Sequence, residues 1–313
     1  MLRPAASLPA LALLVTLALA AGAGQARAVS PTSAGSVTAP SADSLEALWR
    51  AAKQTVAITP GTTDYQPGRN RVSFLVIDPK GRPVTTPTAT VWVATGLKQR
   101  PFQQTLARSE PIGVPGGASA GIGSIFVVTV TLPRPGTYWL LAAPLADGVS
   151  IRALGNLVVR ARPSAPGVGD RAVAARTPTL ASTGGKLARL STATHPDPRL
   201  YRISVAAALS RHLPFVVAFA TPRFCTSRTC GPVVDVVDAV AKKLARTPVR
   251  FIHAEIYRDN DPAKGFAPWV RQWRLDYEPA TFVVDRRGIV RAKLVGAFSV
   301  GELERTVRST LLR

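Results

Sequence analysis

Residues 215–245 read FVVAFATPRFCTSRTCGPVVDVVDAVAKKLA, and this stretch decides the fold of the C-terminal part of the chain. Its first six residues form a continuous apolar run, which predicts a buried strand. Its second half carries apolar residues at helical spacing after Pro232, a residue that favours the first turn of a helix. Cys225 and Cys230, the only cysteines among 313 residues, lie between the two. The pair is therefore predicted at a strand-to-helix junction, where the helix dipole favours a thiolate over a thiol.

The flanking sequence extends this pattern in both directions. Before the stretch, residues 204–212 predict a short helix. After it, the expected elements are a strand at 249–257, a hairpin of two strands at 280–285 and 289–298, and a last helix starting at Ser299. Ser299 and Glu302 have the spacing of a capping box. The predicted order is strand, helix, strand, followed by strand, strand, helix.

On these residues, 199–313 resembles the thioredoxin-like superfamily, an α/β fold. It is similar to exported bacterial members with four residues between the cysteines and an N-terminal β-sandwich. The matching stretches are 219–236, 251–257 and 278–288. The resemblance implies that Pro279 is a cis-proline facing the cysteine pair. A cis bond between Glu278 and Pro279 is chemically reasonable, since cis peptide bonds cost little only before proline. It further implies that Glu278, Pro279 and Pro232 border the substrate, and that the backbone at Pro279 is free to pair with a substrate peptide.

Three features depart from the thioredoxin pattern. Four residues separate the cysteines, where thioredoxins have two. Cys230 opens the sequence CGPV, so Val233 stands where the second cysteine of a CGPC motif belongs. The acidic residue that often assists the second thiol is missing from the apolar strand 216–220.

The spacing of the cysteines constrains how they can bond. Five positions of ideal helix turn a side chain by about 500° and advance it about 7.5 Å, which is too far for a relaxed disulfide. A bridge therefore requires 226–229 to form a loop and the helix to start near Gly231. Arg223 and Arg228 are expected to lower the pKa of a neighbouring thiol, and Glu278 to raise it. The sequence leaves open which cysteine attacks; the favoured assignment has Cys225 as the exposed nucleophile and Cys230 as the resolving thiol, buried nearer the helix.

The predicted function is an exported thiol–disulfide oxidoreductase acting on protein thiols or disulfides, with no metal or cofactor. One alternative is a non-enzymatic envelope binding protein with a structural disulfide. Another is a thiol peroxidase, because TPRFCTSRTC (221–230) is similar to the TPxCTxxxC motif of some peroxiredoxins, with one extra residue. A copper site would need His253 beside the two thiolates. His253 shares a strand face with Glu255, and we expect it to be a hydrogen-bonded, partly buried residue of a central strand.

The N-terminal residues predict export. Arg3 precedes an apolar run over 8–21, and Ala26-Arg27-Ala28 supplies small residues for cleavage before Val29, so 1–28 reads as a signal peptide. An uncleaved membrane anchor is the alternative. The formal net charge is +21, but the basic residues are dispersed, so nucleic acid is not an expected partner. Loose attraction to anionic envelope polymers or membrane surfaces is the favoured interpretation of this charge.

Between the signal and the C-terminal domain, two further regions are predicted. Residues 29–60 read as a flexible linker with one or two helical turns near Leu45. Residues 61–161 contain five short β-rich runs separated by turn signals, which predicts an all-β immunoglobulin-like sandwich. Residues 162–198, rich in proline and glycine, read as a linker lying partly against the next domain.

Trp269 and Trp273, four apart, are expected to pack against the fold, or to form a rim for a partner polypeptide.

Overall fold

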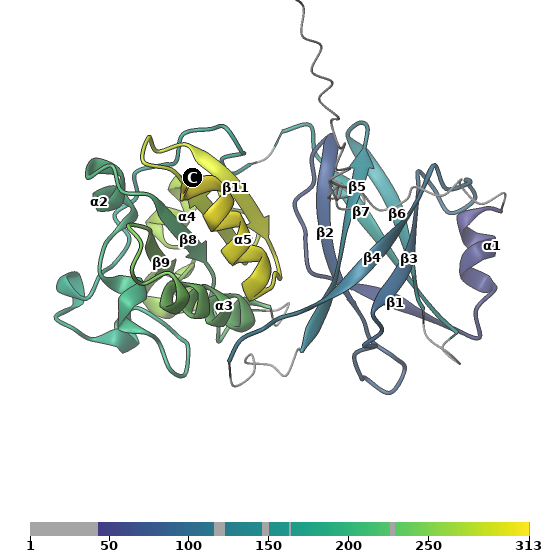
Figure 1. Ribbon diagram of the computed structural model, residues 1–313, viewed down its shortest axis with the longest axis horizontal. Coiled ribbons are helices and arrows are strands. Elements are labelled where there is room, and N and C mark those ends of the chain that lie inside the picture. Colours follow the sequence, from purple (N-terminus) through teal and green to yellow (C-terminus); the bar gives the residue numbers. More distant parts are fainter. Residues whose placement is uncertain (1–42, 116–122, 146–149, 163, 226–228, 313) are drawn as a thin grey trace, which may run out of the picture. The chain divides into compact units, whose positions relative to one another are not determined.

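The computed structural model describes residues 43–115, 123–145, 150–162, 164–225 and 229–312 (Figure 1). The predicted signal peptide, the start of the 29–60 linker and Arg228 lie outside these ranges. No helix among the described residues is long and apolar enough to cross a membrane. The strands form a seven-stranded barrel and a separate four-stranded sheet, and each is described below by itself.

The first seven strands close into a barrel in the order β1-β2-β5-β4-β3-β6-β7. Closure comes from β1, which pairs antiparallel with β2 and parallel with β7. Along β5, Val128, Val130 and Leu132 point into the barrel core and alternate with exposed threonines, as a half-buried strand requires. The strands are β1 (Gln54–Pro60), β2 (Gly68–Val76), β3 (Thr88–Ala94), β4 (Gln103–Pro111), β5 (Ser124–Leu132), β6 (Gly136–Pro144) and β7 (Ile151–Val159).

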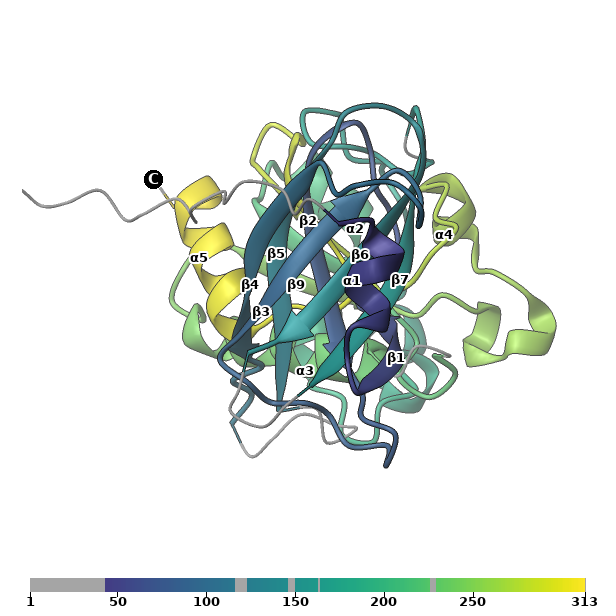
Figure 2. The ribbon, with the colours of Figure 1, turned by 90° about the vertical axis from the view of Figure 1, so that its right-hand side faces the viewer.

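The barrel differs from the expected pair of immunoglobulin-like sheets, which is not confirmed. Two strands were missing from the prediction, β1 inside the expected 29–60 linker and β4 between two predicted runs. In β1 only Val56 and Ile58 contact the barrel core, and both are partly buried, whereas β4 buries Ala107 alone, so each strand gives a weak apolar signal in the sequence. The predicted helical turns near Leu45 are confirmed as α1 (Leu45–Arg50), capped by Ser44. Figure 2 shows α1 on the outside of the barrel, where Leu45 packs with Ala94 and Leu141.

The second sheet has the order β11-β10-β8-β9, with β8 and β9 parallel and the other two pairs antiparallel. Its strands are β8 (Phe215–Phe219), β9 (Arg250–Ala254), β10 (Ala280–Val284) and β11 (Val290–Val295), and its helices are α2 (Val205–Ser210), α3 (Cys230–Lys243), α4 (Pro268–Gln272) and α5 (Val300–Leu311). This is the predicted order of elements. It confirms the thioredoxin-like arrangement of the C-terminal part of the chain.

Both faces of this sheet are covered, which explains the continuous apolar run at β8. Val216 and Ala218 face a core shared with α3 and α5, whereas Phe215, Val217 and Phe219 face a core shared with α2 and α4. Because successive side chains alternate between the faces, a strand covered on both sides has no polar position. All five residues of β8 are accordingly buried.

The segment 164–198 packs against the C-terminal fold. It contains the short 3-10 helices η2 (Ala181–Thr183) and η3 (Leu187–Arg189). Ala175 and Leu190 are buried in the two cores of the four-stranded sheet. The carbonyl of Ala175 also accepts a hydrogen bond from the backbone of Ala206 in α2, at 2.8 Å. This agrees with the expectation that the segment lies against the next domain.

Candidate functional site

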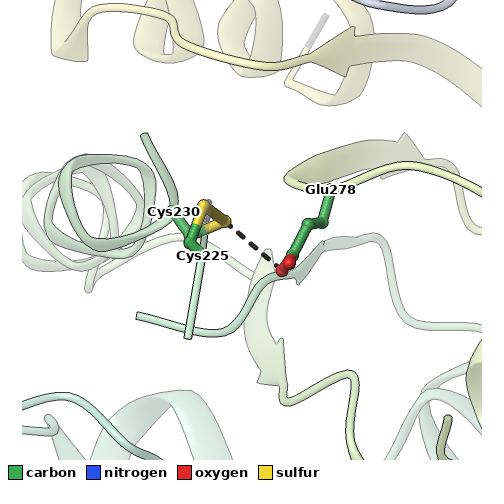
Figure 3. A group of neighbouring side chains, drawn as sticks. All are labelled: Cys225, Cys230 and Glu278. Atoms are coloured by element: carbon green, nitrogen blue, oxygen red, sulfur yellow. Dashed lines mark hydrogen bonds between the residues drawn. A yellow bond between two sulfur atoms is a disulfide. The ribbon is translucent and has the colours of Figure 1, made fainter. Parts of the chain in front are cut away.

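Cys225 and Cys230 are joined by a disulfide at the start of α3, with their Cα atoms 5.9 Å apart (Figure 3). Cys225 belongs to the loop after β8, and Cys230 is the first residue of α3, directly after the N-cap Thr229. The helix thus begins close to Gly231, as expected. Cys230 belongs to this helix and Cys225 does not. The separation lies in the range that a disulfide spans.

The two sulfurs differ in their access to solvent. Cys230 is completely buried, whereas Cys225 is partly exposed. A macromolecular partner can therefore reach Cys225 first. The exposed position expected of Cys225 agrees with this difference, and the division of roles between the two cysteines stays a prediction.

Glu278 lies directly against the buried sulfur. Its Oε2 is 3.4 Å from Sγ of Cys230 and accepts a hydrogen bond from the backbone N–H of Thr221 at 3.1 Å (Figure 3). Burial is the largest effect on this carboxyl and raises its pKa to about 7; the Thr221 hydrogen bond opposes the rise and the charge of Glu255 adds to it. An acidic side chain thus lies beside the buried sulfur, and it comes from the loop before β10 rather than from β8. Glu278 was predicted to border the substrate, which stays a prediction; the structure places its carboxyl group against the Cys230 sulfur.

The Glu278–Pro279 peptide bond is cis, as the resemblance implied. Pro279 itself is buried. Its carbonyl accepts a hydrogen bond from the N–H of Gly296 at 2.9 Å, and proline has no N–H to donate. The backbone at Pro279 was expected to be free to pair with a substrate peptide. For the carbonyl this expectation is wrong, because Gly296 after β11 already donates to it.

The other predicted site residues lie around the pair in different settings. The guanidinium carbon of Arg223 lies 5.6 Å from the ring centroid of Phe224, and the Arg223 side chain is exposed. Pro232 is confirmed in the first turn of α3, where it is buried. Arg228 lies outside the described residues, so its predicted effect on a thiol stays a prediction.

His253 is held by two hydrogen bonds inside the fold. Its Nε2–H donates to the carbonyl of Ala220 at 3.0 Å, and its Nδ1 accepts from the hydroxyl of Tyr201 at 2.7 Å. This pairing fixes the neutral tautomer, and burial lowers the pKa of the imidazole. Both ring nitrogens are occupied, as expected of a structural histidine. Two details differ from the prediction, because His253 is fully buried and β9 is an edge strand of the sheet.

A metal-like grouping among the described residues is Cys225, Cys230 and Glu278, whose donor atoms all lie within 4.8 Å of one another. The sulfurs are bonded to each other in this state, so they offer no thiolate to a metal. His253 does not belong to this group. The copper alternative required His253 beside the two sulfurs, and the structure does not bring these three residues together.

Thr221, the threonine of the peroxidase-like motif, is completely buried. Its backbone N–H binds Glu278, and its Oγ1 has no hydrogen-bond partner among the described residues. The hydroxyl is thus closed off from solvent in the disulfide-bonded state.

Two residues connected to the Cys225 loop were given no functional role from the sequence: Glu255, noted only as a neighbour of His253, and Thr192. Glu255 is buried, and its Oε1 accepts hydrogen bonds from the backbone N–H and the hydroxyl of Thr192, at 2.6 and 2.8 Å. The Thr192 Oγ1 in turn accepts from the backbone N–H of Arg223 at 3.1 Å. This chain of bonds ties the end of β9 to the loop that carries Cys225. An acidic residue in an apolar strand was the available signal for Glu255, whereas Thr192 gave none.

The two predicted tryptophans have separate roles. Trp273 is fully buried and packs against the rings of Phe219 and Phe282. Trp269 is partly exposed, and its Nε1–H donates to the backbone carbonyl of Glu255 at 2.6 Å. Packing against the fold is therefore confirmed for both residues, since Trp269 also packs against the core that contains Trp273; Trp269 in addition lines a surface cavity.

No family model matches the sequence, and no curated protein matches it either. Among solved structures, the chain is similar to a thiol:disulfide interchange protein, a thioredoxin family protein from Chlorobium tepidum TLS. The two share 16% sequence identity with a TM-score of 0.32, over 47% of this chain and 99% of the other. The order and direction of the strands, described above, identify the fold independently of this likeness.

Proposed function

We propose that the protein is an exported thiol–disulfide oxidoreductase that exchanges disulfides with partner proteins through Cys225 and Cys230. The observation that carries the proposal is the arrangement of the pair. A partly exposed sulfur is bonded to a buried sulfur at a helix N-terminus, and the buried sulfur lies 3.4 Å from a carboxyl group with a pKa of about 7. A purely structural bridge has no need of such a titratable neighbour.

The reaction with a substrate disulfide starts from the reduced pair. The Cys225 thiolate attacks one substrate sulfur, the substrate S–S bond breaks, and the other substrate sulfur leaves as a thiolate that takes up a proton. Cys230 then attacks the Cys225 sulfur and releases the second substrate thiolate. The substrate gains two electrons and the cysteine pair loses two. An external dithiol restores the reduced pair, and the reverse sequence oxidises substrate thiols.

Glu278 handles the proton of the resolving step. Because its Oε2 lies next to the Cys230 sulfur, the carboxylate can take the thiol proton as Cys230 attacks, and the resulting acid can protonate the leaving substrate thiolate. A group transfers protons in both directions best when its pKa is close to the working pH. Its pKa of about 7 meets that condition.

Trapping of mixed disulfides tests the proposal. The Cys230→Ser variant keeps the exposed Cys225 and should accumulate disulfide-linked partners that a reductant releases. The Cys225→Ser variant should accumulate far fewer. A structural disulfide predicts that both variants trap nothing and each loses about 2 kcal/mol of stability. Consumption of peroxide that depends on Cys225 would instead support a peroxidase.

Export and location belong to the same proposal. Cleavage before Val29 would release a basic mature chain into a compartment where disulfides persist. Its positive charge would hold it loosely near anionic envelope polymers or lipid headgroups. Sequencing the N-terminus of the protein recovered from outside the cytoplasm tests this, and a chain that retains its first residues in the cytoplasm would contradict it.

A further inference from the structure

A cavity of about 550 Å³ opens in the C-terminal fold beside the loop that carries Cys225. It is lined by the end of β9, by α4 and by the segment around η3 (Leu187–Arg189). Its lining residues include Glu255, Tyr257, Trp269, Arg189 and Lys264. The exchange reaction described above uses none of them.

Glu255 lines this cavity and carries an acceptor that has no partner among the described residues. The residue is 2% exposed, and its Oε1 is saturated by the two bonds from Thr192. Its Oε2 is buried and has no hydrogen-bond partner among the described residues. A buried carboxylate oxygen without a donor is costly, so such an atom is satisfied by a ligand or by ordered water. A positively charged donor is the partner that a carboxylate binds most strongly.

Two aromatic side chains, Trp269 and Tyr257, line the same cavity as Glu255. The indole of Trp269 is fixed by its hydrogen bond to the Glu255 carbonyl. The ring of Tyr257 is stacked with that of Phe266, at 5.8 Å between centroids. Aromatic faces attract cations and also cover the aliphatic stem of lysine or arginine. An apolar stem carrying a cationic head therefore matches both the walls and the carboxylate.

The cations near the cavity do not occupy the Glu255 oxygen. The Lys264 ammonium pairs with Asp259 at 3.0 Å. Arg189 is exposed at the rim, where water and salt screen its charge. Neither positive group is thus a partner of the buried Glu255 oxygen.

Two connections link the lining of this cavity to the residues that directly precede Cys225. The Tyr257 ring meets the ring of Phe224 edge to face, 6.4 Å between centroids, and Phe224 directly precedes Cys225. Thr192 links Glu255 to the backbone of Arg223, two residues before Cys225. A side chain bound in the cavity would belong to the polypeptide whose sulfur reacts with Cys225.

We propose that this cavity binds a lysine or arginine side chain of the substrate protein, and so selects substrates with a basic residue close to the reacting cysteine. The head group donates to Oε2 of Glu255 and the stem lies along Trp269 and Tyr257. The inference rests on the proposed function and names the substrate class of the same site.

Matched disulfide peptides test the proposal. Two peptides differ only in a lysine or a norleucine placed near the cysteine, and the full mature chain reduces each with an external dithiol as electron source. We expect the lysine peptide to have a kcat/KM about tenfold higher, since a charged hydrogen bond is lost in the other. In Glu255→Gln the ratio should fall to about one, because the amide still accepts from Thr192 but carries no charge. Glu304→Gln, which removes a carboxylate from α5, should keep the wild-type ratio.

A wild-type ratio near one, or a ratio that Glu255→Gln leaves unchanged, would overturn the proposal. The wild-type ratio remains decisive if the Glu255 variant folds poorly. Should the protein reduce neither peptide, the proposed function fails, and binding to the oxidised protein then tests the cavity alone. Nα-acetyl-lysine amide should shift the Trp269 indole N–H resonance in a saturable way, and the norleucine analogue should not. Equal shifts from both probes would refute a cation site.

Discussion

Replacing Glu278 by glutamine should make the Cys230 thiol more acidic. The carboxylate lies 3.4 Å from the Cys230 sulfur, so its charge opposes formation of the thiolate. At that distance, two unit charges repel by about 1.2 kcal/mol in water and about 5 kcal/mol at the effective dielectric near a protein surface. These energies correspond to about 1 to 3.5 pKa units. Since Glu278 is partly exposed, we expect a fall in the lower half of that range.

The assay uses the Cys225→Ser background, which leaves Cys230 as the single thiol. Its ionisation is followed by thiolate absorbance or by the alkylation rate across pH, with and without Glu278→Gln. Burial raises the pKa of Glu278 to about 7, so the two proteins should differ mainly above that pH, where the carboxylate is charged. The thiol and the carboxyl titrate as a coupled pair, and the comparison therefore uses whole titration curves.

Glu304→Gln is the matched control, because Glu304 pairs with Lys243 and Arg308 on the outer surface of the same fold. It should leave the Cys230 titration unchanged. A thiol pKa that stays constant or rises in Glu278→Gln would refute the assignment of Glu278 as the proton carrier of the resolving step.

Three further predictions concern stability. Between the ordinary carboxyl pKa of 4.5 and the native value of about 7, Glu278 is protonated in the folded protein and ionised in the unfolded one. The stability of the oxidised protein should therefore fall by about 1–2 kcal/mol as the pH rises through this window, and denaturant titrations should show the fall. An equal fall in Glu278→Gln would exclude this carboxyl as its source. Trp273→Ala should cost about 3–5 kcal/mol because it empties a fully buried site, and a thermal-unfolding loss below about 1 kcal/mol would contradict that packing. Tyr201→Phe removes the hydroxyl that donates to Nδ1 of His253 and should lower the free energy of unfolding by about 1–3 kcal/mol without changing the rate of disulfide exchange. A slower exchange at unchanged stability would instead give this pair a chemical role.

The sequence was sufficient to predict the C-terminal fold because its signals are local. A covered strand, a proline in the first turn of α3 and a cis-proline before β10 each act within a few residues. The barrel was less predictable, because its closure depends on the parallel pairing of β1 with β7, far apart in the chain. Both β1 and β4 also contribute few apolar side chains to the barrel core, so their signal in the sequence is weak.

The candidate site was predictable in its sulfurs and not in its surroundings. Cys225 and Cys230 are unique in the sequence, and their separation already required a loop before the helix. The role of Glu278 depends on the fold bringing it to within 3.4 Å of a sulfur 48 positions earlier in the chain. Glu255 and Thr192, 63 positions apart, share a hydrogen bond that no local pattern indicates.

The reduction potential of the Cys225–Cys230 pair tests the central claim most directly. Equilibration of the full mature chain with a dithiol buffer of known potential would measure it. An exchange-active pair should have a potential above about −300 mV, in the range of known thiol–disulfide exchange proteins. A potential below that value would show that the disulfide resists reduction by partners, and would contradict its use as a redox centre.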